Sequence, residues 1–122
     1  MKICVSSRGE NLESQVDPRF GRCGYFIFVD TESMKFEAVR NEFAAAGGGA
    51  GIQSARLVAD REAEAVLTGN CGPNAYNTLQ AANITVYPGA TGSIREAVNL
   101  FISGKMESTD GANVDSHFGM RG

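Results

Sequence analysis

The sequence predicts an α/β fold with one five-stranded mixed sheet, in the order 3-2-1-4-5, flanked by three helices. Three observations lead to this prediction. Segments typical of strands come first and then alternate with segments of helical periodicity. Glycine-rich segments follow four of the five predicted strands. The chain has 122 residues, 43% hydrophobic and 20% charged, which is the length and balance of one compact domain.

The first three elements are predicted to be strands. Residues 2–6 (KICVS) form an apolar run typical of a buried strand, and residues 25–30 (YFIFVD) are rich in aromatic and β-branched residues. Residues 35–41 (KFEAVRN) alternate between apolar and polar, as a half-exposed strand does. A long polar loop at 7–23 separates the first two strands. The short turn at 31–35 makes the second and third strands antiparallel.

Helices and strands alternate in the next part of the chain. Residues 52–61 place their apolar side chains on one helical face, and residues 63–69 form an apolar fourth strand. Within residues 70–83, Pro73 marks the start of the second helix. Residues 84–89 (ITVYPG) then supply the fifth strand.

The last predicted helix carries its own start and stop signals. Ser93 and Glu96 have the spacing of a capping box, and Gly104 ends the helix. From Lys105 onward the chain is polar, glycine-bearing and aperiodic. We therefore expect one domain over residues 1–104 and a flexible carboxyl-terminal tail over residues 105–122.

The connections determine the strand directions and the position of a site. Helical crossovers join parallel strands, so the third, fourth and fifth strands run the same way, and the first joins them when it is antiparallel to the second. The segments that follow these four strands then lie at one edge of the sheet, where open α/β sheets bind ligands. They are residues 7–23, 47–51, 68–74 and 87–93, which hold most of the fifteen glycines.

This edge is predicted to bind an anion. Three of the segments lead into a helix, so we expect three helix N-termini with unpaired N–H groups to face one site. Arg8, Arg19 and Arg22 would add positive charge. The alternative that these glycines are only turn and cap residues stays open. The candidate cofactor-binding residues are Arg19, Cys23, Gly48, Gly49, Gly51, Asn70, Cys71, Gly72, Gly89, Thr91 and Gly92.

Composition and charge exclude several classes of protein. The formal net charge of −3 leaves no basic surplus for nucleic acid. No apolar run has the length of a membrane span, and the polar start is unlike a secretory signal, so a cytoplasmic location is expected. The three cysteines are far apart in sequence, which predicts free thiols or metal ligands rather than a disulfide framework.

The sequence offers no catalytic set. The glycine-rich segments match neither the dinucleotide-binding nor the Walker pattern, and the strand ends lack the carboxylates of a two-metal hydrolase. Cys4 is predicted to be an inert core residue. Cys23 and Cys71 lie in the glycine-rich segments, and the helix that follows Cys71 would favour its thiolate. These two thiols are candidate ligands of iron or another soft metal, although they could equally be unrelated loop residues.

The tail partly repeats the motif of the first loop. Residues 16–24 (VDPRFGRCG) and residues 114–122 (VDSHFGMRG) share Val, Asp, Phe, Gly and the final Gly in register. The second copy carries His117, the only histidine, which would complete a ligand set with Cys23 and Cys71. Chance similarity in a glycine-rich chain is the alternative interpretation.

Four ordered motifs resemble a known family. They are VDPRFGRCGYFIFVD, GGGAGIQSARLVAD, TGNCGPNAYNTLQAANITVY and GATGSIREAV, and together they are similar to the dinitrogenase iron-molybdenum cofactor biosynthesis family, the NifX-like proteins and the carboxyl-terminal domain of NifB. The resemblance implies a ribonuclease-H-like fold and a role in binding an iron–sulfur or iron–molybdenum cluster. Several members carry a histidine where Arg19 stands, and an alanine and a proline at Cys23 and Gly24, so the family's histidine ligand has no counterpart at Arg19.

These inferences lead to a non-enzymatic carrier or scaffold for an iron–sulfur or iron–molybdenum-type cluster in metallocofactor biosynthesis. Its partners would be the metallocluster and cluster-assembly proteins, with no nucleic acid and no membrane, and the chain would be a monomer or a weak homodimer. The alternatives are a regulatory module for a small anionic ligand and a protein-interaction module that uses the edge strand at 35–41.

Overall fold

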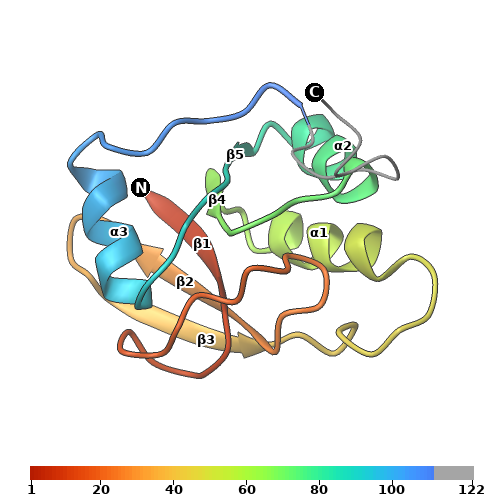
Figure 1. The fold of residues 1–122 in the computed structure, drawn as a ribbon, viewed down its shortest axis with the longest axis horizontal. Helices are drawn as coiled ribbons and strands as arrows, with labels where there is room; N and C mark the ends of the chain where they lie inside the picture. The colour runs from red at the N-terminus through yellow and green to blue at the C-terminus, as the bar shows by residue number, and fades with distance from the viewer. Residues whose placement is uncertain (112–122) are drawn as a thin grey trace.

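The computed structural model describes residues 1–111, and it confirms the predicted sheet (Figure 1). Five strands lie in the order β3-β2-β1-β4-β5. β1 pairs antiparallel with β2 and parallel with β4; β2 and β3 are antiparallel, and β4 and β5 are parallel. The elements are β1 (Lys2–Ser7), β2 (Tyr25–Asp30), β3 (Phe36–Arg40), α1 (Ala50–Asp60), β4 (Ala65–Leu67), α2 (Pro73–Ala81), β5 (Thr85–Tyr87) and α3 (Ile94–Ile102).

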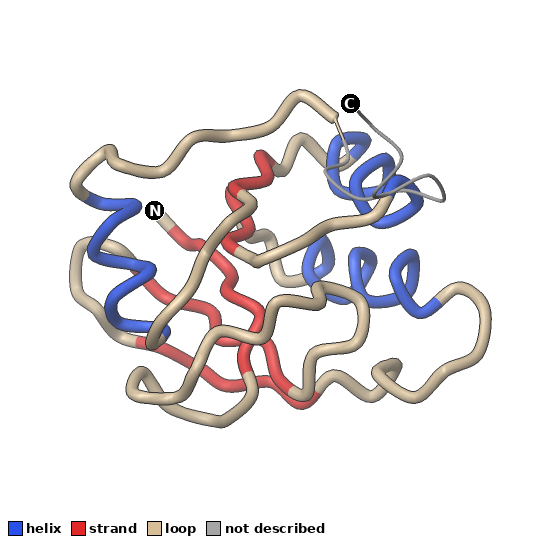
Figure 2. Tube along the Cα trace, viewed as in Figure 1, coloured by secondary structure: helices blue, strands red, loops and turns tan. Residues whose placement is uncertain are grey.

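Helices cover both faces of the sheet, α1 and α2 on one face and α3 on the other (Figure 2). Alternation along the strands separates the core into two clusters. In β1, Cys4 packs with α1 and α2, whereas Ile3 and Val5 pack with α3. This is the two-residue period of a strand buried on both faces, and it explains why residues 2–6 read as a continuous apolar run.

The helix boundaries follow local signals, with one difference. α3 begins at the capping box, in which Ser93 Oγ accepts from Glu96 N and the Glu96 carboxylate accepts from Ser93 N. α2 begins at Pro73, as predicted. α1 begins at Ala50, two residues before the predicted start, because the left-handed Gly49 (φ 92°) allows the helix to begin directly after the glycine run. No helix within residues 1–111 is long and apolar enough to cross a membrane.

The loop between β1 and β2 is bound to the carboxyl edge of the sheet. Asn70 N donates to Pro18 O at 2.7 Å, Phe20 N donates to Asn70 O at 3.2 Å, and Val16 N donates to Gly92 O at 2.9 Å. The backbone also meets at van der Waals distance, since a Cβ added to Gly69 would lie 2.6 Å from Pro18 Cα. The loop therefore forms part of the packed domain.

Residues 105–111 return along β5. Thr109 N donates to Val86 O at 2.9 Å in an isolated antiparallel bridge, and Met106 packs against the α3 side of the core. These contacts attach the first part of the predicted tail to the sheet edge. The domain boundary at Gly104 and the flexibility of the remaining residues stay predictions, and so does the ribonuclease-H-like classification.

Substitution of Gly69 by Ala tests the loop contact. The new methyl group would lie 2.6 Å from Pro18 Cα and 2.9 Å from Pro18 O, and neither backbone atom can move without shifting the loop. We expect Gly69→Ala to lower the free energy of unfolding by about 2 kcal/mol in urea denaturation. Gly48→Ala is the matched control, because no described atom lies within 4 Å of its Cβ position. Equal stabilities of the two variants would contradict the contact.

Candidate functional site

The N-termini of α1 and α2 lie side by side at the carboxyl edge. A Cβ placed on Gly51, in the first turn of α1, would lie 3.4 Å from Ala75 Cβ in the first turn of α2. Gly21 of the β1–β2 loop packs against the same turn, since its Cβ position is 2.9 Å from Gly51 Cα. The lack of side chains at Gly21 and Gly51 allows three backbone segments to meet there.

Neither of these two helices has a side-chain cap. Their N-cap residues are Gly49 and Gly72. Within the described residues, five backbone amides in the first turns of these helices donate no hydrogen bond to a protein group. They are the amides of Ala50, Gly51, Ile52, Asn74 and Ala75. Aligned free amides at helix N-termini carry partial positive charge and bind anions. The two first turns together can bind an anion through backbone groups.

The N-terminus of α3 is not available to an anion, so the expectation of three free helix N-termini is wrong for this helix. Ile94 N donates to Ser14 O and Arg95 N donates to Leu12 O, both at 2.9 Å. Glu96 N donates to the Ser93 hydroxyl. The β1–β2 loop thus saturates the first turn of α3, a long-range contact with no local signal.

Two of the candidate residues after β5 line a separate cavity. Gly89 and Thr91 line a cavity of about 490 Å³ together with residues 105–108, and neither Cys23 nor Cys71 belongs to its lining. Gly92 O accepts the bond from Val16 N. The structure therefore assigns Gly92 to loop packing and separates the lining of this cavity from the two thiols.

Arg19 and Asn70 are brought together, as candidate site residues should be. They form an isolated parallel bridge between the β1–β2 loop and the end of β4. The Arg19 side chain is 65% exposed, and its Nε and Nη2 atoms donate to the Asp17 carboxylate, each at 3.3 Å. This carboxylate is only 3% exposed and raises the pKa of the Arg19 guanidinium. Arg19 is therefore an oriented cation whose charge is largely balanced by Asp17.

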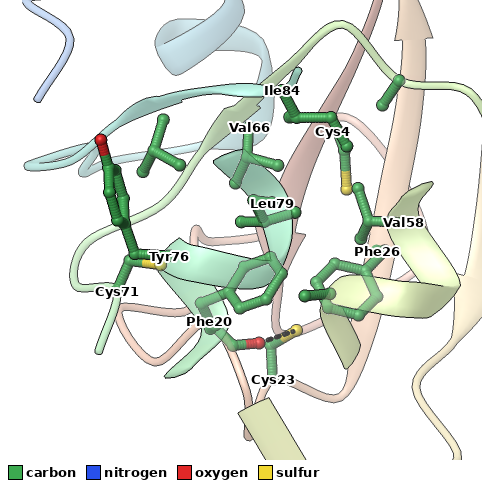
Figure 3. Close-up of a cluster of buried hydrophobic side chains, with 14 of the residues drawn as sticks. Cys4, Phe20, Cys23, Phe26, Val58, Val66, Cys71, Tyr76, Leu79 and Ile84 are labelled. Carbon is green, nitrogen blue, oxygen red and sulfur yellow. Dashed lines mark hydrogen bonds between the residues drawn. The ribbon is translucent and has the colours of Figure 1, made fainter. Parts of the chain in front are cut away.

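Cys23 and Cys71 are buried in the core between the sheet and the α1–α2 layer, in the same cluster as Cys4 (Figure 3). Cys23 Sγ donates to Phe20 O at 3.3 Å. Burial, and secondly the charge of Asp17, raises the pKa of Cys23 to about 12. Burial also raises the pKa of Cys71 to about 12, so the expectation that the start of α2 favours its thiolate is wrong. The free protein holds both sulfurs as neutral thiols.

A complete metal site is not formed by residues 1–111. They contain no group of three or more His, Cys, Asp and Glu side chains that could hold a metal ion. His117 lies outside the described residues. Its role, and those of Cys23 and Cys71 as metal ligands, stay predictions.

Two buried polar residues were missed in the sequence. Asn41 follows β3 and is 3% exposed, and Ser54 of α1 is fully buried. The single hydroxyl proton of Ser54 is shared between two acceptors, Gly21 O at 3.1 Å and Asn41 Oδ1 at 3.3 Å from Oγ, which ties α1 to the β1–β2 loop. A serine on the apolar face of the helix, beside Ala50, Ala55 and Val58, is the signal that could have identified this network.

Thiol labelling tests the burial of Cys23 and Cys71. At pH 8 a thiol of pKa about 12 has about a thousandfold less thiolate than one at the ordinary value of 9.0, so we expect iodoacetamide to react far more slowly in the native protein than in urea. The native rate should rise about tenfold per pH unit between pH 8 and 10, because the thiolate fraction does. Mass spectrometry measures both rates, and native labelling within tenfold of the unfolded rate would contradict the assignment.

Known proteins share both the sequence and this architecture. The family model of the dinitrogenase iron-molybdenum cofactor matches residues 1–104. The apo form of the orange protein from Desulfovibrio gigas is 38% identical, with a TM-score of 0.90 over 93% of this chain and 96% of that chain. A Thermotoga protein provisionally named a NifB protein is 36% identical, with a TM-score of 0.77 over 88% and 91% of the two chains. An uncharacterised protein of Methanocaldococcus jannaschii is 35% identical over 97 residues, covering 77% of this chain and 82% of its own. The chain belongs to the dinitrogenase iron-molybdenum cofactor family.

Proposed function

We propose that the chain is a non-enzymatic carrier or scaffold for an anionic iron–sulfur or iron–molybdenum-type cluster in metallocofactor biosynthesis. The observation that carries the proposal is the pair of uncapped helix N-termini at Gly51 and Ala75, which meet beside Cys71 and the loop of Cys23. Membership of the family supports the choice of a metallocluster over other anions.

The residues at this edge suit a cluster in two ways. Free amides of the α1 and α2 first turns would hold the anionic sulfides or oxygens of the cluster by hydrogen bonds. The thiols of Cys23 and Cys71 would supply soft ligands to its metal ions. Because both thiols are protonated and buried in the free protein, ligation would displace two protons and open the local packing of the core. Cluster uptake is then expected to be favoured by higher pH.

A second candidate function follows from the same burial of the thiols. A small organic or phosphorylated anion could bind the amides of α1 and α2 while Cys23 and Cys71 remain core residues. The two functions differ in their need for sulfur, because the regulatory module would tolerate replacement of both thiols and the cluster carrier would not.

The proposed partners are the cluster and the proteins that assemble or receive it. A cytoplasmic location and a monomer or weak homodimer complete the proposal. Within the described residues β3 pairs with β2 alone, so its outer edge offers unpaired backbone groups to a partner strand.

Anaerobic reconstitution with ferrous iron and sulfide tests the cluster function. We expect the full chain to bind iron and gain a visible absorption band. Cys23→Ser and Cys71→Ser should each shorten the lifetime of the band by about tenfold or more in the presence of an iron chelator, because each removes a ligand.

Cys4→Ala is the control for this experiment. Cys4 is buried in the same cluster but lies within β1, away from the carboxyl edge, so its removal should leave the lifetime unchanged. Thermal unfolding of all variants checks that the fold persists. A wild-type chain that acquires no band would overturn the cluster function. If a nucleotide or phosphorylated metabolite then raised the melting temperature of the double Cys→Ser variant, the second function would replace it.

The role of the tail is tested with a chain that ends at Gly111, which keeps the Thr109 bridge to β5. If His117 is a ligand, the shortened chain and His117→Ala should lose cluster lifetime equally, by about tenfold. Equal lifetimes in these variants and the full chain would remove His117 from the ligand set.

A further inference from the structure

The Arg22 side chain folds back onto the segment that leads into α1. Its Nη1 atom donates to Ala44 O at 3.1 Å and to Ala46 O at 2.7 Å, and its Nη2 atom donates to Gly47 O at 3.4 Å. Carbonyl oxygens are the negative ends of peptide dipoles, and a planar guanidinium can reach several of them at once. The guanidinium therefore binds the chain itself instead of projecting freely into the candidate site.

The bound segment has few other restraints. Gly47, Gly48 and Gly49 follow one another directly before α1, and glycine has the largest conformational freedom of any residue. No described atom lies within 4 Å of a Cβ placed on Gly47 or Gly48. Within residues 1–111 the amides of these three glycines donate no hydrogen bond to the protein. The Arg22 bonds thus hold the chain just before the glycine run, at Ala44 and Ala46, and hold the first residue of the run, Gly47.

Buried contacts hold the same region on its inner side. The Asn41 amide donates to Cys23 O at 3.0 Å and, more weakly, to Gly21 O at 3.4 Å. Asn41 Oδ1 accepts from Phe43 N and from the Ser54 hydroxyl. The turn that carries Arg22, the segment after β3 and the first turn of α1 consequently form one connected unit.

We propose that Arg22 is a positioning residue, whose bonds to the carbonyls of Ala44, Ala46 and Gly47 hold the start of α1 in the conformation that presents its free amides. The inference rests on the proposed function for the nature of the ligand, but the ordering of the segment does not depend on it. It replaces the expectation that Arg22 adds charge directly to an anion. Without the Arg22 bonds, the glycine run would become ordered only when the ligand binds, and the loss of conformational entropy would lower the affinity.

Replacement of Arg22 by Lys separates positioning from charge. Lysine keeps the positive charge but presents one ammonium group, which cannot replace a planar fork across three carbonyls. In the ligand-free protein we expect Arg22→Lys and Arg22→Ala to raise amide hydrogen exchange about tenfold in peptides covering residues 44–53, where Ala44, Ala46 and Gln53 donate backbone bonds. After reconstitution with iron and sulfide, both variants should lose the cluster about tenfold faster than wild type.

Lys35→Ala is the charge-matched control. Lys35 is an exposed residue of the turn before β3, and its removal takes away one positive charge at the start of β3 that is remote from the segment before α1. This variant should keep the wild-type exchange rates and cluster lifetime. Thermal unfolding should show similar midpoints for all variants, because Arg22 is exposed and lies outside both core clusters.

The remaining outcomes separate the positioning role of Arg22 from the cluster function. Unchanged hydrogen exchange in Arg22→Lys would overturn the positioning role whatever the ligand is. A cluster lifetime that Arg22→Lys retains and Arg22→Ala loses would assign Arg22 to direct charge attraction and would also overturn it. Faster exchange in both variants, combined with a wild-type chain that acquires no iron, would support the positioning role and overturn the cluster function.

Discussion

Close backbone contact between the β1–β2 loop and the sheet edge is the constraint on which the rest of the structure depends. Pro18 packs on Gly69 at the end of β4, and Gly21 packs on Gly51 in the first turn of α1. Any larger residue at Gly21 or Gly69 would place a Cβ atom less than 3 Å from backbone. Because these contacts hold, Arg19 meets Asn70, Cys23 turns into the core, and the starts of α1 and α2 lie side by side.

The proposed site would attract anions mainly through backbone dipoles. Of the three arginines expected to add charge, Arg19 binds Asp17 and Arg22 binds carbonyl groups, whereas Arg8 is exposed. A chain of net charge −3 can therefore still offer an anion site, because the free amides of two helix N-termini carry their own partial charge. Such a site would distinguish charge and shape without a large electrostatic field around the whole protein.

The thiols show a conflict between packing and ionisation. The same contacts that bring Cys23 and Cys71 to this part of the molecule also exclude water from them, and the loss of hydration disfavours the thiolate. Metal ligands must be deprotonated, so ligation has to compensate for this cost. In the proposed carrier, ligands that regain protons and core contacts on release would favour reversible binding of the cluster.

Local signals in the sequence determined the elements, their order and the edge at which a site would form. The apolar runs at β1 and β2, the short turn before β3 and the capping box of α3 each act over a few residues, so they could be predicted without the fold. Glycine spacing likewise placed Gly51, Cys71 and Asn70 at the carboxyl edge. Only the tertiary structure decided that the loop occupies the first turn of α3, that burial raises the pKa of both thiols, and that Asp17 and the 44–47 segment bind Arg19 and Arg22. The physical reason is that burial and hydrogen-bond pairing depend on residues distant in the chain, whose approach is set by the packing of the whole domain.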